Sequence, residues 1–173
     1  MPLPLTDLQP AADVNATLLK YMKYIIVILL IFVFDIAEAA DKNDWPDTSA
    51  MYAGLSQKEI LDKKSSKIKT LTLQISAELE ENMPYNGEFL ADLFKDHQTK
   101  WHDYVDSTCM LTGQATGAGG SWPSYYALKC ATNMADQRVF NMVNSLQCIK
   151  RQTRNKNNYD IPLCLYQSYS IEY

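Results

Sequence analysis

Residues 101–130 read "WHDYVDSTCMLTGQATGAGGSWPSYYALKC", and the predicted arrangement of helices follows from them. Each end has a helix-like composition and one cysteine, Cys109 or Cys130, and four of the six glycines of the chain lie between them. Before the glycines, apolar residues recur at steps of three and four, the spacing of one helix face. The stretch therefore predicts two antiparallel helices joined by a glycine-rich connection.

The flanking sequence extends this pattern to three helices, which predicts an all-α fold, a three-helix antiparallel bundle. The first helix is expected to begin at Ser56, because Ser56 and Glu59 form an S-x-x-E capping box. The second is expected from about residue 88, and the third from Ser121 or Ser124 to about residue 150. The three predicted apolar faces comprise Ile60, Ile68, Leu71, Ile75 and Leu79; Leu90, Leu93, Phe94, His97, Trp101, Tyr104, Val105 and Thr108; and Ala135, Val139, Met142, Leu146 and Ile149.

The N-terminal segment has the order of a secretory leader. Lys23 precedes an apolar run over residues 25–34, and the small-residue pattern Ala37, Glu38, Ala39 follows. This order predicts a cleaved signal peptide over residues 1–39, with Met22 as an alternative start. An uncleaved membrane anchor is the competing interpretation, although its acidic residues interrupt the run well short of the roughly 20 apolar residues that span a bilayer.

Two further segments flank the helical domain predicted over residues 56–150. Residues 40–55 are polar and turn-rich, which predicts an exposed lead-in. In residues 151–173 the apolar side chains of Ile161, Leu163 and Leu165 alternate, a pattern typical of an extended chain. We expect this C-terminal arm to be attached through Cys164 to the end of the third helix.

The four cysteines, Cys109, Cys130, Cys148 and Cys164, all follow the predicted signal peptide. An even number of cysteines in an exported chain indicates two disulfides, and four cysteines allow three pairings. Pairing in sequence order closes the shortest loops and is the preferred interpretation. Zinc is the alternative use, but no cysteine pair has the two-to-four-residue spacing of a structural zinc site. The sequence therefore predicts neither a metal nor a cofactor.

The charge of the chain argues against nucleic acid as a partner. The whole chain carries a formal charge of −4, and residues 41–148 hold 10 Lys and Arg against 14 Asp and Glu. Such a body repels a phosphate backbone and attracts cationic partners in a salt-dependent way. Contact with a membrane is expected only through an uncleaved leader.

The sequence contains no complete catalytic motif, so an enzyme is not predicted. The run "GQATGAGG" lacks the G-K-[ST] ending of a phosphate-binding loop, and the segment before it is a predicted helix, not the strand of a dinucleotide fold. Large aromatic residues beside an adaptable loop are typical of protein-binding surfaces, although they serve equally well to cap a helical core. The candidate partner-binding residues are Gly119, Gly120, Ser121, Trp122, Tyr125 and Tyr126.

The segments "HQTKWHDYVDSTC", "GGS" and "SYYALKCATNMADQR" resemble the lysozyme inhibitor LprI-type N-terminal domain, a family of small exported helical bacterial proteins. The similarity covers about residues 57–148. Val105 departs from it, since the family often has Arg there. The matching residues are Gln98, Trp101, Tyr104, Asp106, Cys109, Gly119, Gly120, Ser121, Tyr126, Cys130 and Arg138.

The resemblance implies a periplasmic or secreted, non-enzymatic protein that inhibits a lysozyme-type muramidase. An envelope structural or interaction protein without effect on lysozyme is the alternative. Within the motif, Asp106 and Arg138 are expected to form a salt bridge between two helices, which would give them and the neighbouring motif residues a structural role.

Overall fold

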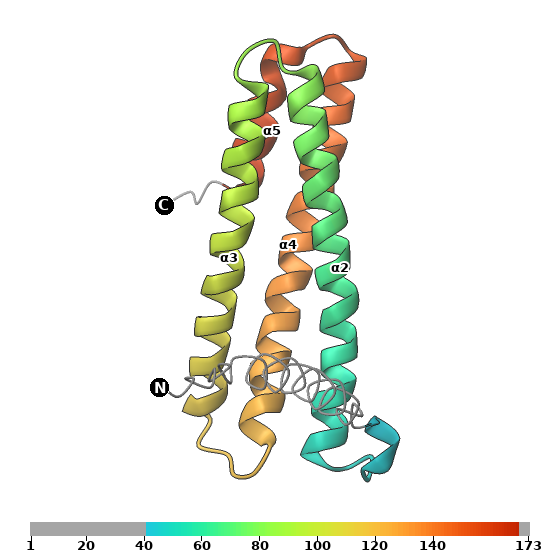
Figure 1. Cartoon of the computed structure of the whole chain (residues 1–173), viewed down its shortest axis with the longest axis vertical. Coiled ribbons are helices and arrows are strands. Elements are labelled where there is room, and N and C mark those ends of the chain that lie inside the picture. Colours follow the sequence, from blue (N-terminus) through green and yellow to red (C-terminus); the bar gives the residue numbers. More distant parts are fainter. Residues whose placement is uncertain (1–40, 170–173) are drawn as a thin grey trace, which may run out of the picture. The chain divides into compact units, whose positions relative to one another are not determined.

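The computed structural model describes residues 41–169; the predicted signal peptide (1–39) and the last four residues of the predicted arm lie outside this range. The described residues form helices and no strand, so the all-α class is confirmed. The elements are η1 (Lys42–Asp44), α2 (Ala50–Asn82), α3 (Gly87–Ala115), α4 (Trp122–Arg154), η2 (Asn158–Asp160) and α5 (Ile161–Tyr169) (Figure 1).

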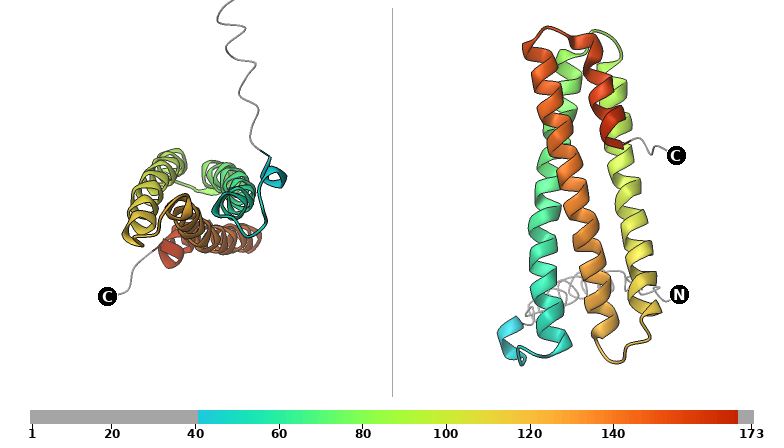
Figure 2. Two further views of the ribbon diagram at one scale, coloured as in Figure 1. Left: turned by 90° about the horizontal axis from the view of Figure 1, so that it is seen from below. Right: turned by 180° about the vertical axis from the view of Figure 1, so that it is seen from behind.

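Three long helices run up, down and up, which confirms the predicted three-helix antiparallel bundle (Figure 1). Helices α2 and α4 each have 33 residues, which corresponds to a length of about 50 Å. Seen along the bundle, α2, α3 and α4 form a triangle, and the short α5 lies against α4 (Figure 2). The fold is therefore three long helices plus one short helix.

The first helix begins earlier than predicted. Helix α2 starts at Ala50, and the Oγ of Ser49 caps it by accepting a hydrogen bond from the backbone N–H of Tyr52 at 3.1 Å. Helix α2 continues through Gly54. A single glycine destabilises a helix by only about 1 kcal/mol, which a helix of this length tolerates. The exposed lead-in is thus shorter than the predicted residues 40–55.

Glu59 has a different partner from the one that the capping box requires. Its carboxylate accepts hydrogen bonds from Lys42 Nζ at 2.8 Å and from Lys63 Nζ at 2.9 Å. These two lysines lower the pKa of Glu59 to about 2. The prediction that Ser56 and Glu59 cap the helix was therefore wrong, and Glu59 instead connects η1 to α2.

The predicted extended C-terminal arm was also wrong, because residues 158–169 are helical. Ile161 and Cys164 are buried whereas Leu163 is 52% exposed, so the side chains follow a helical period and do not alternate. Pro162 lies in the first turn of α5, where its missing N–H costs no hydrogen bond. The two turns of α5 thus cover the core beside α4.

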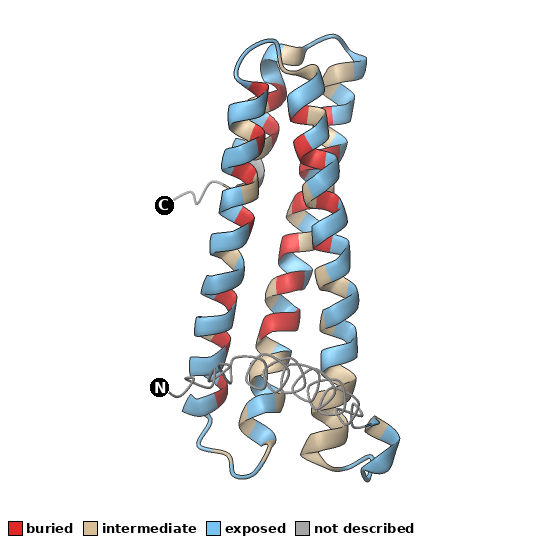
Figure 3. Cartoon of the chain, in the orientation of Figure 1, coloured by how far each residue is buried: buried red, intermediate tan, exposed pale blue. Residues whose placement is uncertain are grey.

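The core is thick in the half of the bundle that α5 covers and thin toward the glycine loop. Every buried residue of α2 lies at or after Ile68 (Figure 3). Near the loop, the buried apolar residues are Val105, Cys109 and Ala131. The main core cluster comprises Ile68, Leu71, Ile75, Leu79, Ala91, Phe94, Ala135, Met142, Leu146, Ile149, Ile161 and Cys164.

The apolar face predicted for α3 is displaced in the structure. Leu93 and Tyr104 are exposed, and the inward positions are Ala91, Gln98 and Gly113, among others. At Gly113, an added Cβ would lie 2.3 Å from the carbonyl oxygen of Pro123. Helices α3 and α4 therefore approach each other closely just before the loop, and only glycine fits at this position.

Candidate functional site

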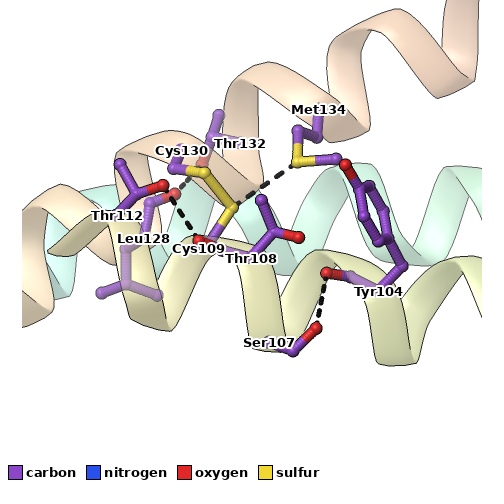
Figure 4. The surroundings of a disulfide bond; sticks show 9 residues. All are labelled: Tyr104, Ser107, Thr108, Cys109, Thr112, Leu128, Cys130, Thr132 and Met134. Atoms are coloured by element: carbon purple, nitrogen blue, oxygen red, sulfur yellow. Dashed lines mark hydrogen bonds between the residues drawn. A yellow bond between two sulfur atoms is a disulfide. The ribbon is translucent and has the colours of Figure 1, made fainter. Parts of the chain in front are cut away.

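A disulfide between Cys109 and Cys130 fixes the base of the glycine loop (Figure 4). The S–S bond is 2.07 Å, and the two Cα atoms are 5.4 Å apart. The thioether sulfur of Met134 lies 3.6 Å from Cys109 Sγ, and because neither sulfur carries a hydrogen this is a packing contact. The predicted pairing of these cysteines is confirmed. The glycine loop therefore connects two helices, α3 and α4, that are also joined by a covalent bond.

A second disulfide joins Cys148 to Cys164, so the sequential pairing is confirmed for all four cysteines. It attaches α5 to α4, as was expected of the C-terminal segment. Two disulfides of this kind indicate an oxidising environment, extracellular or periplasmic.

The loop needs its glycines for backbone geometry. Gly117 has φ +64° and Gly120 has φ +62°, a left-handed conformation that side chains disfavour, whereas Gly119 is open to solvent. Ser121 then occupies the N-cap position of α4, but its side chain makes no capping hydrogen bond. The predicted start of the third helix is confirmed, although not by a hydroxyl cap.

Three aromatic side chains gather at the start of α4. The ring of Trp122 lies 5.6 Å from that of Tyr125 and 6.3 Å from that of Tyr126, and the two tyrosine rings are 5.2 Å apart. Trp122 is 38% exposed and Tyr126 is 37% exposed. The three rings thus support one another outside the buried core. We call Gly119, Gly120, Ser121, Trp122, Tyr125 and Tyr126 the loop-end surface.

Two grooves lie on the other side of α4, the side that carries Ser124 and Leu128. One, between α3 and α4, has a volume of about 510 Å³ and is lined by Met110 and Ala127 among others. The other, of about 230 Å³, lies between the first turns of α2 and α4 and includes Met51. The thin core therefore leaves apolar surface accessible around the loop end of the bundle.

Two polar residues of the resemblance motif, Gln98 and Arg138, lie in a buried cluster. Arg138 is 6% exposed, and its Nε donates to Gln98 Oε1 at 3.0 Å. Its guanidinium carbon lies 5.2 Å from the ring centroid of Trp101 and 4.6 Å from that of Tyr169. These contacts hold α3, α4 and α5 together, so the role of Arg138 here is structural.

The expected salt bridge between Asp106 and Arg138 is not formed. Asp106 is exposed, and it lies eight residues, or about 12 Å along α3, from the Gln98 position at which Arg138 binds. Within residues 41–169, no carboxylate lies within salt-bridge distance of Arg138. The buried cation is held by an amide, an imidazole and two aromatic rings.

His97 accepts one of these hydrogen bonds. Arg138 Nη2 lies 2.8 Å from His97 Nδ1, and because a guanidinium can only donate, Nδ1 must be the unprotonated nitrogen. His97 is only partly covered, and this partial burial, together with the charge of Arg138, lowers its pKa. The contact with Arg138 is therefore made by the neutral form of the imidazole. Sequence reasoning placed His97 on an apolar face and missed both Arg138 and Tyr169 as its neighbours.

No protein-family model matches this chain, and no curated protein or solved structure is detectably similar to it. The resemblance to the LprI-type domain thus stays a prediction from the motif. In the part of the chain that the structure describes, no three metal-binding side chains gather at one point. Over the same range, the helices are too short or too polar to cross a membrane.

Proposed function

We propose that this is an exported, non-enzymatic protein that binds another protein through the loop-end surface, and that its partner is a lysozyme-type muramidase. One observation carries the proposal. Trp122, Tyr125 and Tyr126 form a mutually supported cluster, partly exposed, on the first turns of a helix.

Aromatic residues of this kind dominate the binding energy of protein interfaces, especially where they are held rigid before binding. The disulfide at Cys109 and Cys130 and the close approach at Gly113 both restrict the helix that carries the cluster. An interface formed here would therefore lose little conformational freedom. The glycines at positions 119 and 120 leave room for a partner beside the rings.

Charge and compartment support the choice of partner. Residues 41–148 carry a formal charge of −4, and animal-type lysozymes are strongly basic, so association is favoured at low salt. The two disulfides agree with a compartment in which an extracellular muramidase would be met. The resemblance to the LprI-type domain points to the same partner.

The proposal is tested by the rate at which a lysozyme lyses bacterial cell walls. Equimolar oxidised protein should slow lysis at low salt, and the effect should weaken as salt rises. Unchanged lysis at both low and moderate salt contradicts the proposal. That result would leave the alternative, an envelope protein whose partners are to be sought by pull-down from envelope extracts.

A further inference from the structure

A second surface feature lies at the opposite half of α4, where the Cys148–Cys164 disulfide meets the solvent. An open groove of about 460 Å³ is lined by both cysteines and by Phe140, Asn141, Asn144, Gln147 and Arg151. We call it the amide groove. It begins at Phe140, about 27 Å along the helix from Trp122, so it is separate from the loop-end surface.

The three carboxamides supply both halves of a hydrogen-bonding site. Asn141, Asn144 and Gln147 follow one another at steps of three residues, so they form a row beside the disulfide. Each carboxamide offers two donor hydrogens and one acceptor oxygen. Within the described residues, Asn141 accepts one hydrogen bond, from Gln137 at 3.1 Å, and the carboxamides of Asn144 and Gln147 make none.

Arg151 places a positive charge at the end of this row. Its neighbour Lys150 is paired with Glu78 at 3.8 Å, but among residues 41–169 Arg151 has no acidic partner. A guanidinium binds a carboxylate through two parallel hydrogen bonds, which a lysine cannot match. The groove is therefore equipped for a ligand that carries both neutral amide or hydroxyl groups and a carboxylate.

Phe140 narrows the class of ligand. It is 62% exposed, and it borders a groove whose other exposed side chains are polar. A sugar ring has one face made mainly of C–H groups and an edge of hydroxyls, so it can cover an exposed phenyl ring while its edge meets carboxamides. A peptide chain offers no comparable flat apolar face at each residue.

From this combination we infer that the amide groove binds an oligosaccharide that contains both N-acetylated and carboxylate-bearing sugars. The carboxamides match the acetamido groups and hydroxyls, Arg151 matches the carboxylate, and Phe140 matches the apolar ring face. The disulfide and the buried Cys164 keep α5 in place as one wall, which limits the ordering cost of binding.

The experiment titrates the oxidised full domain with three tetrasaccharides and follows side-chain amide NMR signals. Hyaluronan tetrasaccharide carries acetamido groups and carboxylates, tetra-N-acetylchitotetraose carries acetamido groups alone, and maltotetraose carries neither. We expect affinity to fall in that order. Arg151→Gln should weaken hyaluronan binding by about tenfold and leave chitotetraose within about twofold. Phe140→Ala should weaken both.

Matched controls distinguish the groove from general surface effects. Arg154→Gln removes an exposed charge one turn away, and Phe89→Ala removes an exposed ring on another helix; neither should alter binding. The inference is overturned if no sugar shifts the signals at millimolar concentration, if maltotetraose binds equally well, or if Arg154→Gln has the effect of Arg151→Gln. No arm involves lysozyme, so failure here is distinct from failure of the proposed function.

Discussion

The guanidinium of Arg138 lies 4.6 Å from the ring centroid of Tyr169, on the last turn of α5. The same group lies over the ring of Trp101 on α3, so one buried cation from α4 connects three helices. Burial of a cation costs its free energy of hydration. Where no carboxylate is paired with the cation, other interactions must offset that cost. Here the ring faces and two hydrogen-bond acceptors, Gln98 and His97, supply these interactions.

We expect Arg138→Lys to lower the free energy of unfolding by about 2 kcal/mol. A lysine keeps the charge, but its single ammonium cannot reach Gln98 and His97 together while it lies flat on two rings. Urea unfolding followed by circular dichroism measures the change. Arg154→Lys is the matched control, since that side chain is exposed and should change stability by less than about 0.5 kcal/mol. Equal stability of the two variants would show that the arginine geometry is irrelevant.

Stability should fall on mild acidification because of His97. Its pKa in the native state lies below the usual 6.5, so below pH 6.5 the unfolded chain binds a proton at this residue more readily than the native state does. The contribution of His97 to the free energy of unfolding is therefore fully present above pH 6.5. It is lost as the pH falls from 6.5 through the lowered pKa. Urea titrations between pH 7.5 and about 4.5 follow this decline.

The variant His97→Gln should reduce the decline, because glutamine can still accept from Arg138 but does not titrate in this range. His102→Gln leaves the contact between His97 and Arg138 unchanged and should keep the decline. If both variants show the same pH dependence as the parent protein, His97 is not the titrating group.

Two glycines inside helices should respond in opposite ways to alanine. Gly113→Ala places a Cβ 2.3 Å from the carbonyl oxygen of Pro123, so α3 and α4 must separate, at a cost of about 2 kcal/mol or more. Gly54→Ala meets no atom within 4 Å and should raise stability by about 0.5–1 kcal/mol. Thermal unfolding of the two variants measures this. A stabilising Gly113→Ala would mean that the helices do not approach as described.

Loss of the loop disulfide should be costly because the core beside it is thin. The bond joins residues 21 apart, for which chain entropy gives about 3 kcal/mol. The double variant Cys109→Ala and Cys130→Ala should keep its helical circular dichroism and lose about that much in urea unfolding. A loss below about 1 kcal/mol would mean that the packing of Val105 and Ala131 alone holds this end together.

Features that depend on local chemistry could be predicted from the sequence. Four cysteines in a chain predicted to be exported were enough to favour the Cys109–Cys130 and Cys148–Cys164 bonds, because short loops close most easily. The positions of α3 and α4 followed from apolar spacing and from the breaks at "NG" and the glycine loop. These signals act within a few residues and need no knowledge of the partner helices.

Features that depend on tertiary contacts could not be predicted. Three alternating apolar residues suggested an extended arm at residues 161–165, but burial of Ile161 and Cys164 against α4 selected a helix. Glu59 suited a capping box by spacing, yet lysines on either side provided better partners. The contact of Arg138 with Gln98 spans 40 residues, and no local pattern marks it.

Binding through the loop-end surface can be measured by calorimetric titration of a lysozyme with the oxidised protein and with two variants, each of which lacks one aromatic ring. Trp122→Ala removes the centre of the aromatic cluster, and Phe89→Ala removes a more exposed ring at the start of α3, away from the loop. We expect the parent protein and Phe89→Ala to bind alike and Trp122→Ala to bind about 30-fold more weakly. Absence of binding by the parent protein, or equal binding by Trp122→Ala, would contradict it.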